Sequence, residues 1–498
     1  MNVNPITRLD YPDPDVIRVE DTYYMVSTTM HFMPGCEILQ SFDLVHWEHV
    51  TYVYETLDHT DAQQLKSGQN IYGQGMWAAS LRYHEGRFCI CFVANDTRKT
   101  YLYTSEKIDG PWKKQLIEGF YHDGSLLFDE DGRNYIVYGN DEIWITELNE
   151  DLTAPKKDGL HRLLVSDHKN PELGYEGSHI QKINGYYYIF LIHSLRDRWM
   201  RTEACFYSDS LEGEFTGGDV LCDDRGYYGQ GVAQGGIVDT PDGKWYAMLF
   251  QDSGAVGRIP ILLPVTWKDH FPFFGQNGHV PEEIEVHSTR PGYIYQPLVG
   301  SDDFCNGLLP RWQFNHDPDP RYYHLDALQG TYTITTREVC TELTQAVNTL
   351  TQRMSYPSCA AEVTVDASAL KEGDVAGLCA LQSCYAAVGI TKHHGKYEVL
   401  MLDKKEDGIL DMTEGTVVES HQMDFRLEAD FCNMKDEARC YYRVNKGDWL
   451  PIGTVHKLYF KLDHFTGCRF GLFCYAAEET GGSACFRDFK YYDVDEIS

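Results

Sequence analysis

Several features that would place this chain in other classes of protein are missing from its sequence. It contains no run of about 18 apolar residues, so no segment is long enough to cross a membrane as a helix. Its first residues show no basic stretch followed by an apolar one, which argues against a secretory signal. The 15 cysteines form no Cys-x-x-Cys pair and no cluster with histidine. We therefore expect a reduced, cytoplasmic protein with buried free thiols.

Positive charge is also scarce. The chain has 43 lysines and arginines against 75 aspartates and glutamates, a net charge of −32. Such a chain repels phosphate backbones and anionic membranes, so neither nucleic acid nor a membrane is an expected partner. Solubility is the simplest role for this charge. The sequence leaves the oligomeric state open, including a homo-oligomer.

Long helical periodicity is absent, whereas 34 tyrosines and 23 phenylalanines favour strands. One short phrase recurs five times: an alternating strand, a polar turn that is usually glycine-containing, and an aromatic-rich strand. The copies open at Asp13, Ala79, Asp123, Glu176 and Gln234. Each copy has the signature of a β-hairpin. Hairpins repeated at this spacing predict a five-bladed β-propeller, one blade for each copy.

The repeat stops near Pro281, and a proline-containing linker leads to a second region of regular short strands. That pattern is typical of a β-sandwich. A length of 498 residues suits two or three domains. The prediction is an all-β protein, with a propeller over residues 1–290 and a sandwich over residues 300–498.

Three of the five copies open on a carboxylate: Asp13, Asp123 and Glu176. Propeller symmetry would bring these positions to one central axis. Glycoside hydrolysis by inversion needs two carboxyl groups about 6.5–9.5 Å apart, one acid and one base. A third carboxylate nearby can raise the pKa of the acid. An aspartate at a strand entry is more often a turn former, but three related by symmetry favour a catalytic site.

The first 290 or so residues resemble glycoside hydrolase family 43, whose members are five-bladed propellers. The resemblance rests on phrases that begin at Tyr11, Trp77, His122, Glu176 and Gly235, all in the same order. The second region resembles the concanavalin A-like, jelly-roll sandwich that follows the propeller in the longer xylosidases and arabinofuranosidases.

The resemblance implies roles for the three carboxylates. Asp13 would be the general base, Asp123 the group that tunes the pKa of the acid and orients it, and Glu176 the general acid. Hydrolysis would then proceed in one step with inversion.

The resemblance also implies residues that bind the sugar. Phe32 and Trp77 match positions where relatives carry sugar-facing aromatics, with propeller core as the alternative. Arg258 matches an arginine beside the acid and the sugar hydroxyls. His179 is interpreted as support for the acid, and Gln234 as a residue of the axis.

No cofactor is required by this chemistry, and calcium is left open. Many family members carry histidine where this chain has Gln234, and an amide is a weaker ligand for an axial ion. In the sandwich, Asp302, Asp303 and Asp488 could hold a structural calcium, although a solvated acidic edge is the favoured interpretation.

The sequence thus predicts an inverting exo-glycosidase that releases terminal β-D-xylose, α-L-arabinofuranose or both from hemicellulose-derived oligosaccharides. Two alternatives are an endo-acting arabinanase and a non-catalytic carbohydrate-binding protein. Retention of all three carboxylates argues against the second alternative, because binding alone needs no acid and base.

Overall fold

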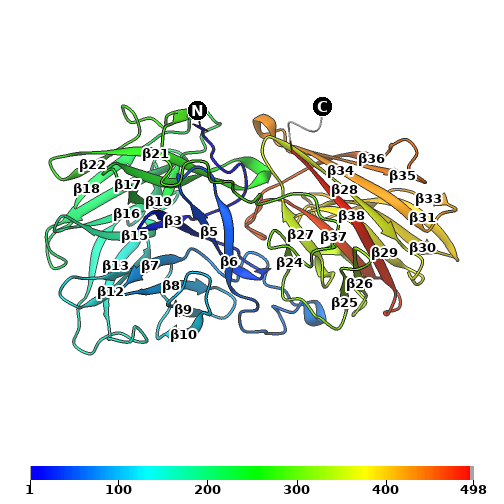
Figure 1. The fold of residues 1–498 in the computed structure, drawn as a ribbon, viewed down its shortest axis with the longest axis horizontal. Helices are drawn as coiled ribbons and strands as arrows, with labels where there is room; N and C mark the ends of the chain where they lie inside the picture. The colour runs from blue at the N-terminus through cyan, green and yellow to red at the C-terminus, as the bar shows by residue number, and fades with distance from the viewer. Residues whose placement is uncertain (1, 494–498) are drawn as a thin grey trace.

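The computed structural model describes residues 2–493 and consists of two β domains side by side (Figure 1). The predicted all-β class, with a five-bladed propeller followed by a sandwich, is confirmed. No helix among the described residues is long and apolar enough to span a membrane. The helical turns are short 3-10 segments: η1 (Lys66–Gly68), η2 (Gly254–Val256), η3 (Leu343–Gln345) and η4 (Cys432–Met434).

Each of the five sequence phrases forms the two inner strands of one four-stranded antiparallel blade. Blade one is β2 (Asp15–Val19), β3 (Thr22–Ser27), β5 (Gly35–Ser41) and β6 (Glu48–Tyr54). Blade two is β7 (Ser80–His84), β8 (Arg87–Ala94), β9 (Lys99–Ser105) and β10 (Lys113–Ile117). Blade three is β11 (Ser125–Phe128), β12 (Asn134–Asn140), β13 (Glu142–Leu148) and β14 (His161–Ser166). Blade four is β15 (Glu176–Ile183), β16 (Tyr186–Ser194), β17 (Arg201–Ser208) and β18 (Thr216–Leu221). Blade five is β19 (Ala233–Asp239), β20 (Trp245–Asp252), β21 (Arg258–Lys268) and β22 (Phe271–Phe274).

The predicted turns lie where the hairpins reverse. Gly86, Gly132, Gly185 and Gly243 all have left-handed backbones, with φ between 77° and 85°. A residue with a Cβ is disfavoured in that conformation, which explains the glycine in four of the five phrases. Because all five hairpins turn at the same end, all five strand entries meet at the other end, around the axis.

The ring is closed between blades five and one. Arg18 of β2 forms an ion pair of 2.5 Å with Asp239 of β19. The chain start adds a second tie, because β1 (Asn2–Val3) pairs with β23 (Glu283–Ile284) beyond the last blade. The Asn4 side chain also donates to the carbonyl oxygens of Leu262 and Pro281. Contacts between the two ends of the first domain thus close the propeller.

The second domain packs two antiparallel sheets face to face. The nine-stranded sheet contains β4 (Phe32–Met33), β24 (Gln313–Asn315), β27 (Leu350–Arg353), β37 (Arg469–Ala476), β29 (Asp374–Leu381), β30 (Ala386–His393), β31 (Lys396–Lys404), β32 (Leu410–Met412) and β33 (Thr416–Val418). The seven-stranded sheet contains β25 (Tyr323–Asp326), β26 (Thr331–Thr335), β38 (Ser483–Asp493), β28 (Ser358–Asp366), β34 (Gln422–Asp430), β35 (Glu437–Arg443) and β36 (Leu450–Lys457).

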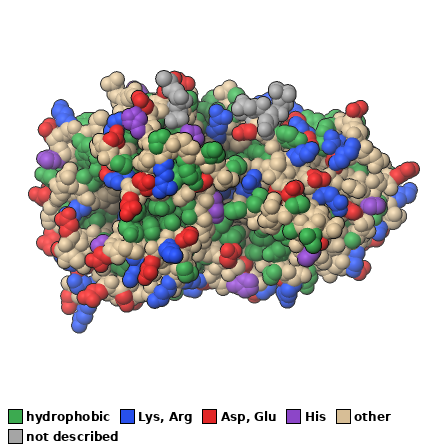
Figure 2. Space-filling model, in the orientation of Figure 1, with side chains coloured by type: hydrophobic (Ala, Val, Ile, Leu, Met, Phe, Trp, Pro, Cys, Tyr) green, Lys and Arg blue, Asp and Glu red, His purple; other side chains and the backbone are tan. Residues whose placement is uncertain are grey.

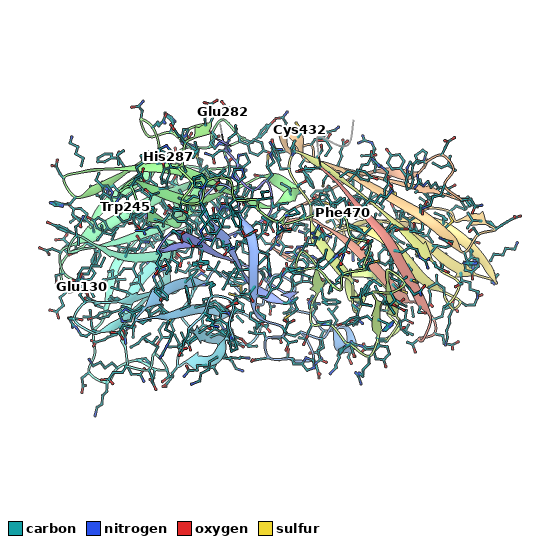
Figure 3. All side chains as sticks on the ribbon, viewed as in Figure 1. Glu130, Trp245, Glu282, His287, Cys432 and Phe470 are labelled. Atoms are coloured by element: carbon teal, nitrogen blue, oxygen red, sulfur yellow. The ribbon has the colours of Figure 1, made fainter. Side chains whose placement is uncertain are left out.

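Alternating strands bury one face of each sheet in a common core. Phe470 of β37 is fully buried and lies inside this domain in Figure 3. The outer surface carries acidic and basic side chains interspersed over the visible face (Figure 2). All 15 cysteines are free, and most of them are buried.

One strand crosses the predicted domain boundary. β4 lies within the first blade's sequence, yet Phe32 and Met33 pair with Asn315 and Phe314 of β24. It therefore forms the edge of the sandwich's nine-stranded sheet. Among the described residues, no named strand lies between β23 and β24. The two domains share a hydrogen-bonded sheet, and the boundaries at residues 290 and 300 stay a prediction.

The insertion between the first two blades, residues 55–79 between β6 and β7, also packs against the sandwich. The Tyr72 hydroxyl donates to the Thr344 carbonyl oxygen at 2.6 Å, and the Ile71 N–H donates to His316 Nε2 at 2.9 Å. The Tyr72 ring stacks on His464, with centroids 3.8 Å apart and planes 2° from parallel. The turn-rich insertion is therefore part of the interdomain contact.

Three histidines are buried in this contact: His31, His316 and His464. The ring of His31 lies 4.8 Å from that of His316 and 5.9 Å from that of His464. Burial lowers the pKa of each, to about 3 for His464, and the His316, His464 and Arg469 charges lower that of His31 further. These histidines are neutral in the folded protein at neutral pH.

This burial predicts a pH-dependent stability. Below about pH 6.5 the unfolded chain binds protons at these histidines and the folded protein does not, so the free energy of unfolding falls as the pH falls. We expect His31→Phe to reduce the slope of unfolding free energy against pH, between pH 6 and 5, by about 1.4 kcal/mol per pH unit. Urea unfolding at several pH values measures it. The exposed His324→Phe should leave the slope unchanged, and equal slopes in all three proteins would contradict the assignment.

Candidate active site

Asp13 lies at the entry to β2 with both carboxylate oxygens occupied. The Thr28 hydroxyl donates to Oδ2 at 2.6 Å, and the Arg258 guanidinium donates to Oδ1 at 3.0 Å. Asp13 is 6% exposed and has a left-handed backbone, with φ of 53°. These two hydrogen bonds, one of them from a guanidinium, fix the orientation of the Asp13 carboxylate.

Asp123 takes the equivalent place before β11 and also has a positive φ, 47°. Its Oδ2 accepts the Gly177 N–H at 3.0 Å. Burial, together with the charges of Glu176 and Asp13, raises the pKa of Asp123 to about 6, although the nearby His122 charge opposes the rise. The pKa shift shows that the three carboxylates influence one another.

Glu176 starts β15, where a bulge between Glu176 and His179 interrupts the register with β16. A bulge re-aims the side chains beside it, here at the mouth of the strand. The Asn140 amide, at the end of β12, donates to Glu176 Oε2 at 2.7 Å. Glu176 thus keeps a defined orientation while its side chain stays 22% exposed.

His122 is a site residue that was not predicted as one, although it directly precedes Asp123. Its Nε2 lies 3.5 Å from Asp123 Oδ2 and 3.6 Å from Glu176 Oε2. The negative charge of Asp123, followed by that of Glu176, raises the pKa of His122 to about 9, against the effect of burial. The imidazole is therefore a cation at neutral pH.

A loop of the sandwich completes the site. The Phe465 ring lies 5.4 Å from the Trp77 ring, and the Arg258 guanidinium carbon lies 4.1 Å from the Phe465 centroid. On its other side, Trp77 lies 5.9 Å from the His122 ring. The predicted sugar-facing Trp77 is therefore beside the carboxylates, and its role stays a prediction. Phe465 gave no signal in the sequence, because nothing local marks a residue so far from the propeller.

Two arginines lie behind the carboxylates. Arg258 pairs with Asp13, the expected base, and its Nε lies 3.5 Å from Asp252. Arg201, at the start of β17, pairs with the same Asp252, and its guanidinium carbon lies 5.4 Å from the half-exposed Trp199 ring. This chain of alternating charges fixes Arg258 at the site.

Asp10 connects the propeller side of the site with the sandwich side. Its Oδ1 accepts the Arg258 N–H at 2.8 Å, and its Oδ2 accepts the Gly467 N–H at 2.9 Å. Asp10 is 4% exposed, and burial raises its pKa in spite of these bonds and of the Arg353 and Arg469 charges. One carboxylate thus positions both Arg258 and the loop that carries Phe465.

Three other predicted residues occupy different surroundings. Phe32 is 2% exposed, with the Arg469 guanidinium carbon 3.4 Å from its centroid and sandwich residues around it, so this ring offers no face to a sugar. His179 Nδ1 forms its hydrogen bond with Asp15 at 3.0 Å, rather than with the acid. Gln234 donates its N–H to Glu203, and its side chain lies directly beside Gly177.

The axis below Gln234 does not suit calcium. Asp15 supplies a carboxylate there, but Arg82 Nη1 donates to its Oδ2 at 2.8 Å and His179 binds its Oδ1. Calcium needs six to eight oxygen ligands, whereas this axis carries a guanidinium.

Two of the three sandwich aspartates, Asp302 and Asp303, accept hydrogen bonds, and a calcium ion at this edge stays an untested alternative. Asp302 accepts the Phe304 N–H and the Trp312 indole N–H, and Asp303 accepts the Cys305 N–H. Among the described residues, the one group of ligand-type side chains close enough for a metal is His122, Asp123 and Glu176. A cation already stands in that group, which makes it a poor metal site.

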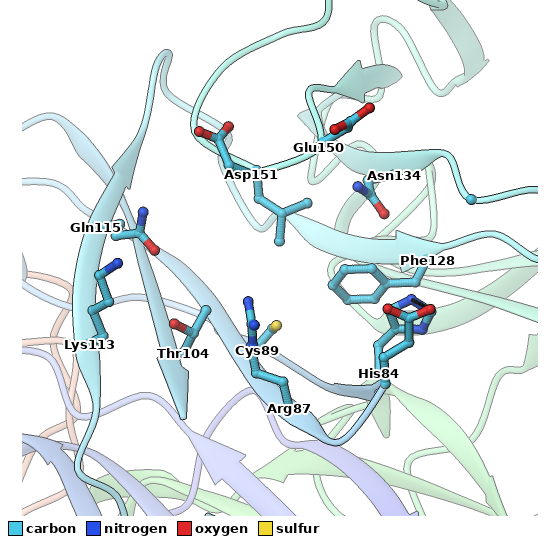
Figure 4. A pocket seen from close by; sticks show the side chains of 13 residues that line it. His84, Arg87, Cys89, Thr104, Lys113, Gln115, Phe128, Asn134, Glu150 and Asp151 are labelled. Carbon is cyan, nitrogen blue, oxygen red and sulfur yellow. Dashed lines mark ion pairs between the residues drawn. The ribbon is translucent and has the colours of Figure 1, made fainter. Parts of the chain in front are cut away.

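A separate hollow of about 410 Å³ lies between blades two and three (Figure 4). His84 and Phe128 stack on its wall, with ring centroids 4.5 Å apart. These residues end β7 and β11, so the hollow lies at the end of the propeller away from Trp77 and Asp123. It shares no residue with the catalytic cluster.

The comparisons with known proteins identify the family. Residues 3–272 match the model for glycosyl hydrolases family 43, and residues 301–492 match the beta xylosidase C-terminal concanavalin A-like domain. The chain belongs to glycoside hydrolase family 43, as the sequence resemblance predicted. It is an inverting glycosidase, and the alternative of a non-catalytic binding protein is wrong.

The relatives differ in the sugar that they are named for. The chain is 26% identical to a "Beta-xylosidase" of Formosa agariphila, over 99% of this chain and 89% of the relative. It is 24% identical to a "Non-reducing end alpha-L-arabinofuranosidase" of Bacteroides ovatus, over 82% and 79%. A solved structure, a "Bifunctional GH43-CE" protein of Bacteroides eggerthii, is 42% identical with a TM-score of 0.93. The match covers 100% of this chain and 64% of the Bacteroides eggerthii chain.

The Gly177 contact gives a direct test of the site. Gly177 has φ of 65°, and a Cβ there would lie 2.7 Å from the Gln234 side chain. We expect Gly177→Ala to displace the donor to Asp123 and to lower kcat/KM on the order of 100-fold. Gly185→Ala is the matched control, since Gly185 has φ of 85° on the same hairpin but open space around it. Equal activity in the two variants would contradict the role of Gly177.

Asp10→Asn tests the link between the domains. An amide in place of the carboxylate presents an NH₂ group to one of two N–H donors, so a buried hydrogen bond is lost. We expect the free energy of unfolding to fall by about 1–3 kcal/mol, and kcat/KM to fall with it because Arg258 and Phe465 shift. Urea unfolding and initial rates measure both, with the exposed Asp303→Asn as control. Unchanged activity in Asp10→Asn would show that the loop is positioned by other contacts.

Proposed function

We propose that this enzyme releases single terminal pentoses, β-D-xylose, α-L-arabinofuranose or both, from short hemicellulose-derived oligosaccharides. The observation that carries the proposal is the closure of the site by Phe465 of the sandwich, against Trp77 and Arg258. A site closed on one side accepts the end of a chain rather than its middle. The names of the relatives support both pentoses.

The roles of the three carboxylates follow from their surroundings. Glu176 donates a proton to the glycosidic oxygen as the bond between that oxygen and the anomeric carbon breaks. Asp13, paired with Arg258, takes a proton from the water that attacks the opposite face of the sugar. Asp123 is too enclosed to attack, and it lies beside the acid, where its negative charge and its hydrogen bond from Gly177 help to orient the site.

Three side chains beside the carboxylates hold the sugar in this proposal. Trp77 covers an apolar ring face, and the Gln234 amide and the Arg258 guanidinium face sugar hydroxyls. A cytoplasmic location stays a prediction, and it agrees with free cysteines and with short, imported substrates.

A panel of aryl pentosides, with NMR detection of the first-formed product anomer, tests substrate and stereochemistry together. We expect hydrolysis of the β-xyloside, the α-L-arabinofuranoside or both, with inversion, and a loss on the order of 100-fold or more in Glu176→Gln. A retained anomer would exclude Asp13 as the base.

The endo-acting arabinanase is the remaining alternative. Product analysis on linear arabinan and on xylo-oligosaccharides separates the two. Single pentoses from the first time point are expected, whereas a mixture of longer oligomers would replace the exo proposal.

A further inference from the structure

His122 occupies a position between the two carboxyl groups on the acid side of the site. Its backbone carbonyl accepts the Gly139 N–H at 3.0 Å, and the next residue on that strand, Asn140, contributes the side chain that holds Glu176. The end of β12 therefore fixes His122 and Glu176 together.

The imidazole faces negative groups from three elements. Nε2 lies 3.5 Å from Asp123 on its own loop and 3.6 Å from Glu176 on β15, and the Asp13 charge acts from the entry to β2. At these distances Nε2 makes no hydrogen bond within the protein, although the atom is buried. The charges of Glu176 and Asp13 also act on the cations Arg201 and Arg258. Each of these arginines already has an ion-pair partner, Asp252 for Arg201 and Asp13 for Arg258.

This arrangement matters for the proton of Glu176. One oxygen of Asp123 and one of Glu176 lie within 4.8 Å of each other and of His122 Nε2. Two carboxyl groups that close repel each other when both are charged, which opposes release of the acid's proton. A cation between them changes the balance, because it stabilises both as separate carboxylates.

We propose that His122 is a positioning residue that holds the Glu176 carboxylate once its proton has passed to the leaving group. The proposal rests on the proposed acid role of Glu176. The step is balanced without His122 gaining or losing a proton. The Glu176 proton goes to the glycosidic oxygen, the electron pair of the broken bond goes to the same oxygen, and the new carboxylate pairs with the imidazolium.

The first measurement does not depend on the substrate. NMR titration of ¹³C-labelled histidines, with the His122 signal assigned by its loss in His122→Asn, reports the charge between the carboxyl groups. We expect a midpoint near 9, as its environment implies, and a downward shift of at least about one pH unit in Glu176→Gln and in Asp123→Asn. A midpoint near 6.5 that neither variant moves would overturn the proposal even if the enzyme hydrolyses pentosides.

The second measurement uses the leaving group. Hydrolysis of a dinitrophenyl pentoside needs little proton donation, whereas hydrolysis of a phenyl pentoside depends on it. His122→Asn and His122→Phe should lower kcat/KM for the phenyl substrate about 10- to 100-fold and leave the dinitrophenyl substrate within about threefold. The basic limb of the pH profile should move upward, because removing a cation from beside a carboxyl group favours the protonated form of an acid.

His84→Asn is the matched control, since His84 lies on the far end of β7, stacked on Phe128 (Figure 4). It should change neither the leaving-group dependence nor the pH profile. Equal losses on both substrates in the His122 variants, with an unmoved basic limb, would reduce His122 to a structural role. If the wild type hydrolyses no pentoside but the titration is as expected, the proposed substrate is wrong, whereas the positive charge of His122 between the two carboxyl groups is still supported.

Discussion

The Asp10 carboxylate is the interaction on which the complete active site depends. It accepts one N–H from the propeller strand that carries Arg258 and one from the sandwich loop that carries Phe465. This bridge has little conformational freedom, because both hydrogen-bond donors are backbone N–H groups rather than flexible side chains. Arg258 of the propeller and the sandwich loop that carries Phe465 are thereby held in fixed positions relative to each other, although they come from different domains.

The interdomain contact extends this constraint over a wide area. β4 adds an edge strand to the sandwich, the insertion stacks Tyr72 on His464, and Arg353 reaches Glu37 and the Tyr11 ring. A hydrogen-bonded edge cannot slide without breaking its ladder. The docking of the sandwich therefore brings Phe465 beside Trp77 and Arg258, the contact on which the exo proposal is based.

Within the site, charge is arranged so that similar carboxyl groups behave differently. Arg258 and Thr28 donate hydrogen bonds to Asp13, while burial raises the pKa of Asp123 to about 6. His122 places a positive charge beside Asp123 and Glu176. These different environments agree with the proposed roles of base, modulator and acid, and hydrolysis with inversion requires such a division of roles.

The sequence by itself determined the five hairpins, their glycine turns and the carboxylates at three strand entries, because alternation and turn chemistry act between neighbours in the chain. The family resemblance then supplied the roles. Only the tertiary structure decided that Phe32 is interdomain core, that Phe465 closes the site and that His122 stands between two carboxyl groups. Those outcomes depend on how domains and blades dock, and docking brings together residues whose local sequence carries no mark of the contact.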